Sequence, residues 1–236
     1  MHFKDLGDSA ILLEWEQKID ASINHQVHHL NEAILDQKIP GIRYTIPAYS
    51  SLCIAFNPLK ISKNTILVII DKIKNESELS KLKESHCLKI PVCYDVKFGL
   101  DLQSMSKTLN LSIESIIEKH YDKRYQVYML GFMLGFPYMG IVDPIIQMPR
   151  KNNPRKEVSA GSIGIAGNQT GIYPSNAPGG WQIIGRTPIE IFDISKGFPF
   201  TIEAGDYIQF HPVSIDEYYK IKAAHKTGDY QVEYEK

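Results

Sequence analysis

The side chains best suited to chemistry are concentrated in residues 131–188, which hold 10 of the 16 glycines and 7 of the 13 prolines. Arginine suits carboxylate or phosphate groups because two parallel N–H donors meet two oxygens. Aromatic rings add stacking faces. For Arg150 and Arg155, a surface ion pair is an equally good interpretation. The candidates for holding a phosphorylated intermediate or a nucleotide phosphate are Arg150, Lys151, Arg155, Lys156, Gln169, Thr170, Tyr173, Trp181 and Arg186.

His120 is the candidate for acid–base chemistry, because histidine changes its charge near neutral pH. It also ends a predicted helix over residues 112–120, where the helix dipole favours a cation. The sequence does not decide between these two roles. The spacing of the other residues supports no Ser-His-Asp or Cys-His catalytic arrangement.

We expect no metal site. At about 100° per residue, a histidine cluster falls on the side of its predicted helix opposite the apolar residues, which is typical of a solvated face. The cysteines lack a C-x-x-C pair and zinc's usual close spacing, so we interpret them as buried thiols in a reducing compartment. The histidines are His25, His28 and His29, and the cysteines are Cys53, Cys87 and Cys93.

Nucleic-acid binding is also unsupported. Residues 102–120 have the outline of a helix-turn-helix, but Glu114 and Glu118 on its second helix would repel phosphates. The glycines within 161–171 match neither the dinucleotide fingerprint nor the phosphate loop. The sequence therefore contains no recognisable complete ATP site.

The composition indicates a soluble globular protein. The chain is 43% hydrophobic and 22% charged, with a formal net charge of -1, which argues against disorder and against attraction to nucleic acid or anionic membranes. No apolar run approaches the roughly 20 residues that span a bilayer. The N-terminal sequence MHFKDLGDSA lacks a signal-peptide core, so we expect a cytoplasmic location.

Residues 1–90 are predicted to form a ferredoxin-like α+β domain. Strand-like and helical periods alternate in the order β-α-β-β-α-β, which is the split βαβ arrangement. Asp20 or Ser22 can cap the first helix. The predicted strands are 9–15, 42–49, 51–56 and 87–94, and the predicted helices carry apolar stripes over 23–34 and 66–73.

Residues 91–236 are predicted to form a β-barrel domain, with the two domains meeting near 88–98. Two short helices over 102–120 precede about ninety residues in which glycine and proline recur too often for helices. Short apolar strands between turns then suggest a closed or nearly closed barrel. Ser214 and Glu217 form a capping box at the start of a final helix. The expected barrel strands include 125–130, 182–184, 189–192 and 207–210.

Several long motifs now support a resemblance to a known family. The chain resembles the family shared by the B subunit of bacterial 5-oxoprolinase, the sporulation-kinase inhibitor KipI and proteins labelled allophanate hydrolase subunit 1. The resemblance covers nearly the whole chain. Its motifs are GDSAILLEW, PAYSSLCIAF, IPVCYDVKFGLDL, GFMLGFPYMGIVDP, PRKNNPR, AGSIGIAGNQTGIYP and PGGWQIIGRTP.

The resemblance implies a cyclophilin-like barrel after the N-terminal domain, and an enzyme that needs two companions, subunits C and A. Together these would open the lactam of 5-oxoproline to glutamate, using ATP with Mg²⁺. On this reading, His120, Arg155 and Arg186 are candidate catalytic residues. The candidate binding residues are Arg150, Gln169, Thr170, Tyr173 and Trp181.

Two departures and two alternatives accompany this resemblance. Where the family usually has Gly-Phe-x-Pro-Gly-Phe-Pro, this chain has Met133 and Leu134, and where the family usually has Val-Pro-Ala-Gly, this chain has Ser159. The loss of a proline at each place removes backbone restraint from two loops. The main alternative function is that of a KipI-like module that docks on a sensor histidine kinase and blocks phosphotransfer. A carboxyltransferase-like role in urea metabolism ranks third.

Overall fold

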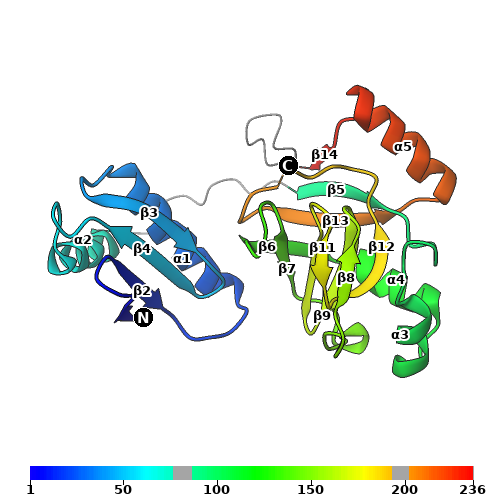
Figure 1. Ribbon diagram of the computed structural model, residues 1–236, viewed down its shortest axis with the longest axis horizontal. Helices are drawn as coiled ribbons and strands as arrows, with labels where there is room; N and C mark the ends of the chain where they lie inside the picture. Colours follow the sequence, from blue (N-terminus) through cyan, green and yellow to red (C-terminus); the bar gives the residue numbers. More distant parts are fainter. Residues whose placement is uncertain (77–86, 193–201, 236) are drawn as a thin grey trace. The chain divides into compact units, whose positions relative to one another are not determined.

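The structure is a computed structural model that describes residues 1–76, 87–192 and 202–235. The chain forms two units, Met1–Glu84 and Ser85–Lys236 (Figure 1). Each unit combines helices with an antiparallel or mainly antiparallel sheet. The predicted mixture of helices and strands is therefore confirmed.

The N-terminal unit is a four-stranded antiparallel sheet with two helices. Its strand order is β1-β2-β4-β3. The two central strands, β2 and β4, are neighbours in the sheet although α1 and β3 separate them along the chain. The elements are β1 (His2–Asp5), β2 (Ala10–Glu14), α1 (Ala21–Asp36), β3 (Ile42–Pro47), β4 (Ser51–Phe56) and α2 (Lys63–Glu76).

Local sequence explains α1. The Asp20 side chain accepts a hydrogen bond of 3.0 Å from the Ile23 amide, which satisfies one of the free donors at the helix start. The predicted apolar stripe faces the core, with Val27 completely buried against residues of both central strands. The predicted helix and its buried face are confirmed.

One strand was assigned to the wrong unit by the sequence. The segment expected to complete the first domain forms β5 (Cys87–Val92), which pairs with β13 (Tyr207–Pro212) and β14 (Glu233–Glu235) of the second unit. Every residue of β5 except Lys89 is buried. Such an apolar segment fits any buried sheet, so its sequence does not identify its partners. The N-terminal sheet takes its outer strand from β1, which the sequence did not predict.

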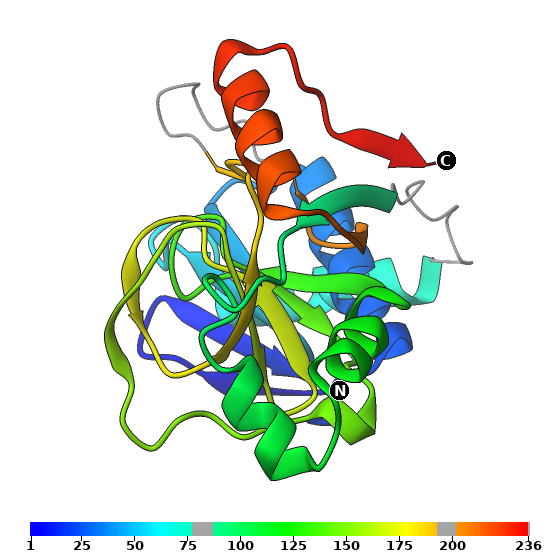
Figure 2. The ribbon, with the colours of Figure 1, turned by 90° about the vertical axis from the view of Figure 1, so that its right-hand side faces the viewer.

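An eight-stranded sheet forms the framework of the second unit (Figure 2). Its order is β12-β9-β10-β7-β6-β13-β5-β14, and a separate two-stranded sheet pairs β11 with β8. The remaining elements are α3 (Leu102–Leu109), α4 (Ile113–Tyr121), β6 (Arg124–Leu130), β7 (Pro137–Gly140), η1 (Pro144–Ile146), β8 (Arg155–Val158), β9 (Ser162–Ala166), β10 (Gln169–Ile172), β11 (Ala177–Gly179), β12 (Gln182–Arg186) and α5 (Ile215–Thr227).

One short bridge connects β12, at one edge of the sheet, to the chain just beyond β5, the strand next to the other edge. Beyond β5, Cys93 exchanges two backbone hydrogen bonds with Arg186, of 2.9 and 3.0 Å. Within the described ranges, the strands do not form a continuously paired closed barrel. Of the strand expected over residues 189–192, residues 189–191 are irregular and Phe192 forms a β-bridge. This irregular segment resembles a strand in sequence because Ile189 and Ile191 are buried in the core.

The helices of this unit follow the predicted boundaries closely. In α5, the Glu217 and Ser214 side chains each bond the other residue's backbone amide, at 2.8 and 3.3 Å, which confirms the capping box. The helices over 102–109 and 113–121 also appear as predicted. None of the helices in the described part of the chain is long and apolar enough to cross a membrane.

The β9–β10 region carries apolar residues on both faces. One face contributes to the main core, and the other supports a smaller aromatic cluster around Phe136 and Trp181. Glycines permit this close packing. A β-carbon at Gly164 would lie 2.9 Å from the Trp181 β-carbon, and one at Gly171 would lie 2.8 Å from the Phe136 ring.

The reassigned strand predicts where the chain can be divided. A fragment comprising Ser85–Lys236 should fold, because it retains β5 and its completely buried Leu88, Ile90 and Val92. A fragment beginning at residue 94 should lack a cooperative thermal transition, since β13 and β14 both lose a partner strand. Circular dichroism melting curves of the two fragments test this. A cooperative melt of the shorter fragment would contradict it.

Candidate functional site

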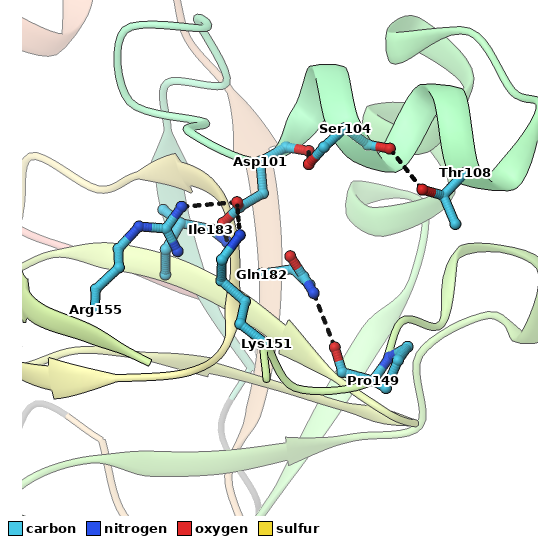
Figure 3. A network of polar contacts seen from close by, with 8 residues as sticks. All are labelled: Asp101, Ser104, Thr108, Pro149, Lys151, Arg155, Gln182 and Ile183. Carbon is cyan, nitrogen blue, oxygen red and sulfur yellow. Dashed lines mark hydrogen bonds and ion pairs between the residues drawn. The ribbon is translucent and has the colours of Figure 1, made fainter. Parts of the chain in front are cut away.

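A buried carboxylate, Asp101, organises the polar interactions of the second unit (Figure 3). Its side chain is 3% exposed. One oxygen accepts hydrogen bonds from Lys151 Nζ at 2.8 Å and from Arg155 Nη2 at 2.7 Å. The other accepts from the Ile183 backbone amide at 2.7 Å. Asp101 therefore joins the start of α3, the segment that leads into β8, and β12.

Burial alone would raise the pKa of the Asp101 carboxyl, but the hydrogen bonds from Arg155, Lys151 and Ile183 outweigh it, and the pKa is lowered. Asp101 stays ionised and fixes one end of the Arg155 guanidinium. Asp101 is not among the site residues predicted from the sequence. The available signal was its place in the motif IPVCYDVKFGLDL, where an aspartate just before a helix is easily taken for a cap.

The segment that carries Lys151 and Arg155 is also held through its backbone. The Gln182 side-chain amide donates to the Pro149 carbonyl at 2.9 Å, as Figure 3 shows. The Lys151 amide donates to the Gly180 carbonyl at 2.7 Å. This segment is thus attached to both ends of the turn that enters β12, and its cations have defined positions.

A group that we call the arginine–aromatic cluster lies beside this network. Trp181 packs at 5.8 Å from the Tyr138 ring, and the Arg150 guanidinium lies 5.9 Å from the Trp181 ring centre. Burial raises the pKa of the Tyr173 hydroxyl, while the Trp181 amide and the charges of Arg150 and Arg155 oppose that effect. The cluster consists of Tyr138, Arg150, Arg155, Tyr173 and Trp181.

An apolar loop borders the cluster. Residues 130–135 line an open hollow of about 420 Å³. Met133 packs against the aromatic cluster, whereas Phe132 and Leu134 are 67% and 58% exposed. Two of these residues, Met133 and Leu134, stand where the family pattern departs from this sequence.

His120 lies inside the core. Its side chain is completely buried, and its ring stacks on Phe210 at 4.8 Å. Nδ1 is 2.8 Å from the Tyr94 hydroxyl, and Nε2 is 2.9 Å from the Thr170 hydroxyl, which itself donates to the Gly164 carbonyl. Nε2 therefore carries the proton and donates to Thr170, while Nδ1 accepts from Tyr94.

Burial lowers the pKa of His120 to about 3, so the ring is neutral at physiological pH. Both nitrogens are occupied, and the side chain is shielded from solvent. This geometry suits a structural residue and not the acid–base role considered from the sequence. Thr170 belongs to the same buried network, so the structure places neither residue beside the arginine–aromatic cluster.

The other two candidates also lie apart from the cluster. Gln169 is half-buried at the first position of β10, paired with Gly140 and Ala166. The Arg186 guanidinium lies 5.0 Å from the Phe98 ring centre, and its charge opposes the rise in the pKa of Tyr218 that burial causes. Arg155 and Arg186 therefore have different partners, contrary to the expectation that they serve one site together. The structure brings together Arg150, Arg155, Tyr173 and Trp181.

The cluster offers cations, hydroxyl groups and ring faces, which suit an anionic organic ligand. Among the described residues, no group of three or more His, Cys, Asp or Glu side chains is placed to hold a metal ion. The chemistry that these residues can perform is binding and charge stabilisation.

Comparison with known proteins places the chain in a family. The pattern of the carboxyltransferase domain, subdomain C and D, matches residues 1–202. The chain belongs to this family. The 5-oxoprolinase B subunit of Bacillus subtilis is 38% identical over 229 residues, which cover 93% of this chain and 95% of that protein.

Solved structures share the fold of this chain. A conserved uncharacterized protein from Pyrococcus horikoshii is 38% identical, with a TM-score of 0.53, and the match covers 92% of this chain and 100% of that one. The Kluyveromyces lactis urea amidolyase gives a TM-score of 0.80 at 21% identity. That match covers 99% of this chain but 16% of the other, and it supports the fold alone.

Asp101→Asn should lower the free energy of unfolding of the second unit by about 2 to 3 kcal/mol. Breaking a fully buried ion pair costs roughly 3–5 kcal/mol, and the effect is smaller here because Lys151 and Arg155 are partly exposed. Because the pKa of Asp101 is lowered, its contribution is present above the unfolded-state value of 3.8 and is lost at more acidic pH.

Urea unfolding followed by Trp181 fluorescence in a Trp15→Phe background measures this change, since the chain has 2 tryptophans. The exposed Glu190→Gln is the matched control and should change stability by no more than about 0.5 kcal/mol. An Asp101→Asn effect as small as that of the control would show that the network contributes little.

His120→Gln should reduce the acid sensitivity of this unit. The pKa of His120 falls from 6.5 to about 3 on folding, so the unfolded chain takes up the proton first as the pH is lowered. Between about pH 7.5 and about pH 4.5, the wild type should therefore lose about 2–3 kcal/mol more than the variant. The same fluorescence assay at several pH values tests this, and parallel pH profiles would refute it.

Proposed function

We propose that this chain is the B subunit of a multi-subunit, ATP-dependent 5-oxoprolinase that cleaves 5-oxo-L-proline to L-glutamate with subunits C and A. The observation that carries the proposal is the match to the Bacillus subtilis 5-oxoprolinase B subunit along nearly the full length of both chains. The arginine–aromatic cluster supports it, because 5-oxoproline is a small organic anion with a ring.

The chemistry explains why several subunits are needed. A lactam carbonyl is a poor electrophile, and phosphorylation of its oxygen by ATP with Mg²⁺ would provide a good leaving group. The intermediate must then be shielded from water, which an interface within the complex can do. In this proposal Arg150, Arg155, Tyr173 and Trp181 contribute to binding, while His120 and Thr170 support the sheet from inside.

We also propose that the units correspond to a ferredoxin-like and a cyclophilin-like domain. In the N-terminal sheet, β1 lies beside β2, where the last strand of a split βαβ arrangement would lie. In this proposal, β1 takes the place of β5, which belongs to the sheet of the second unit. The eight-stranded sheet, in which the Cys93–Arg186 bridge connects the chain beyond β5 to the edge strand β12, supports the second assignment.

A KipI-like role as a histidine-kinase inhibitor is the second candidate. The exposed Phe132 and Leu134 favour it, since an apolar projection of this kind suits docking against helices. The enzyme hypothesis is preferred because the curated relative matched along nearly its whole length is named as an oxoprolinase subunit.

We expect the purified chain alone to release negligible phosphate with 5-oxoproline, and the complex with subunits C and A to do so readily. The physical reason is that the described residues supply binding groups but no phosphate loop. Co-purification followed by phosphate-release assays with and without 5-oxoproline tests the proposal. Turnover by the chain alone would refute the need for partners, and an inactive complete mixture would favour the kinase-inhibitor role.

A further inference from the structure

The Arg155 guanidinium is only half used by the protein. Nη2 bonds Asp101 at 2.7 Å, which fixes the plane of the group. Nη1 is buried and has no hydrogen-bond partner among the residues that the structure describes. A buried donor without a partner destabilises the protein unless a ligand satisfies it. The side chain as a whole is 23% exposed, so part of the side chain reaches the surface beside the buried Nη1.

The local charge favours an anion. Lys151 and Arg155 share a single carboxylate, Asp101. Arg150 adds an exposed third cation, whose guanidinium lies over the Trp181 ring. The nearby Glu157 is exposed and accepts a hydrogen bond from Asn176. Three cations thus accompany one buried carboxylate in this network and the adjoining cluster, and this excess of positive charge would stabilise a bound anion.

The surroundings favour an organic anion over inorganic phosphate. The half-buried Tyr138 supplies ring surface beside the buried Trp181, and the Tyr173 hydroxyl lies within electrostatic range of Arg150 and Arg155. A phosphate site is typically built from successive backbone amides at a helix start or a glycine-rich loop. Here the available donors are side chains beside apolar rings, an arrangement that suits a carboxylate attached to a small apolar body.

We propose that Arg155 Nη1, assisted by Arg150, binds the carboxylate of a small ring-bearing acid, with the ring against the half-buried Tyr138. Asp101 is a positioning residue, because it holds Nη2 and leaves Nη1 for the ligand. This inference rests on the proposed function for the identity of the acid, 5-oxoproline. It assigns recognition of the substrate carboxylate to this chain and phosphoryl transfer to groups elsewhere in the complex.

Isothermal titration calorimetry of the full chain tests the site directly. The probes are 5-oxo-L-proline, 2-pyrrolidinone, which has the same lactam ring without the carboxylate, and inorganic phosphate. We expect 5-oxo-L-proline to bind at least about tenfold more tightly than either other probe, because each lacks one half of the recognised structure. Equal or tighter binding of 2-pyrrolidinone or phosphate, or absence of 5-oxo-L-proline binding, would overturn the proposal.

Arg155→Lys is the informative variant, since lysine preserves the charge beside Asp101 but has no second prong for the ligand. It should weaken 5-oxo-L-proline binding by about tenfold or more and leave 2-pyrrolidinone binding unchanged. Arg43→Lys, at an exposed position on β3, is the matched control and should bind as the wild type does. Arg150→Gln changes an exposed side chain. It should weaken binding of 5-oxo-L-proline and leave binding of 2-pyrrolidinone, which has no carboxylate, unchanged.

Wild-type affinity in both the Arg155 and Arg150 variants would remove these residues from the site. Binding and turnover also separate this inference from the proposed function. A chain that binds 5-oxo-L-proline through Arg155, in a complex that does not hydrolyse it, supports the inference and refutes the enzyme assignment. A complex that hydrolyses 5-oxo-L-proline with an unchanged KM in Arg155→Lys supports the enzyme assignment and refutes the inference.

Discussion

The structure of the second unit depends on one buried carboxylate. Asp101 connects segments that are 50 to 82 residues away along the chain, through Lys151, Arg155 and the Ile183 amide. Burying a charge is unfavourable unless its partners replace the lost water. Three donors do so here, and they also hold the side chains that form the candidate site. The interaction that stabilises this unit therefore also positions the side chains of the candidate site.

The same region connects the chain beyond β5 to the edge strand β12. Residues 93–101 run alongside β12, with backbone hydrogen bonds from Cys93 to Arg186 and from Asp101 to Ile183. The segment is additionally held by the packing of Phe98 against Tyr218 of α5 at 4.6 Å. Because these contacts also determine where β12 begins, they fix the turn that presents Trp181 to the cluster.

The two faces of the sheet separate the buried histidine network from the side chains of the candidate site. Thr170 points inward to His120, where a neutral histidine connects two hydroxyl groups in a dry core. Glycine at position 171 leaves the opposite face open for Phe136, next to Tyr173 and Trp181. Side chains alternate between faces along a strand, so neighbouring residues of one motif serve different purposes. Sequence proximity alone grouped them into a single site.

The sequence by itself determined the features that depend on nearby residues. The α1 stripe and the Ser214–Glu217 capping box were predictable because their partners lie within about four positions. Its motifs also indicated the family. Only the tertiary structure decided that β5 joins the second sheet, that His120 is buried and that Asp101 fixes Arg155. These outcomes arise from contacts between distant segments, where burial and the choice of partner are set by the assembled fold and leave no local periodicity in the sequence.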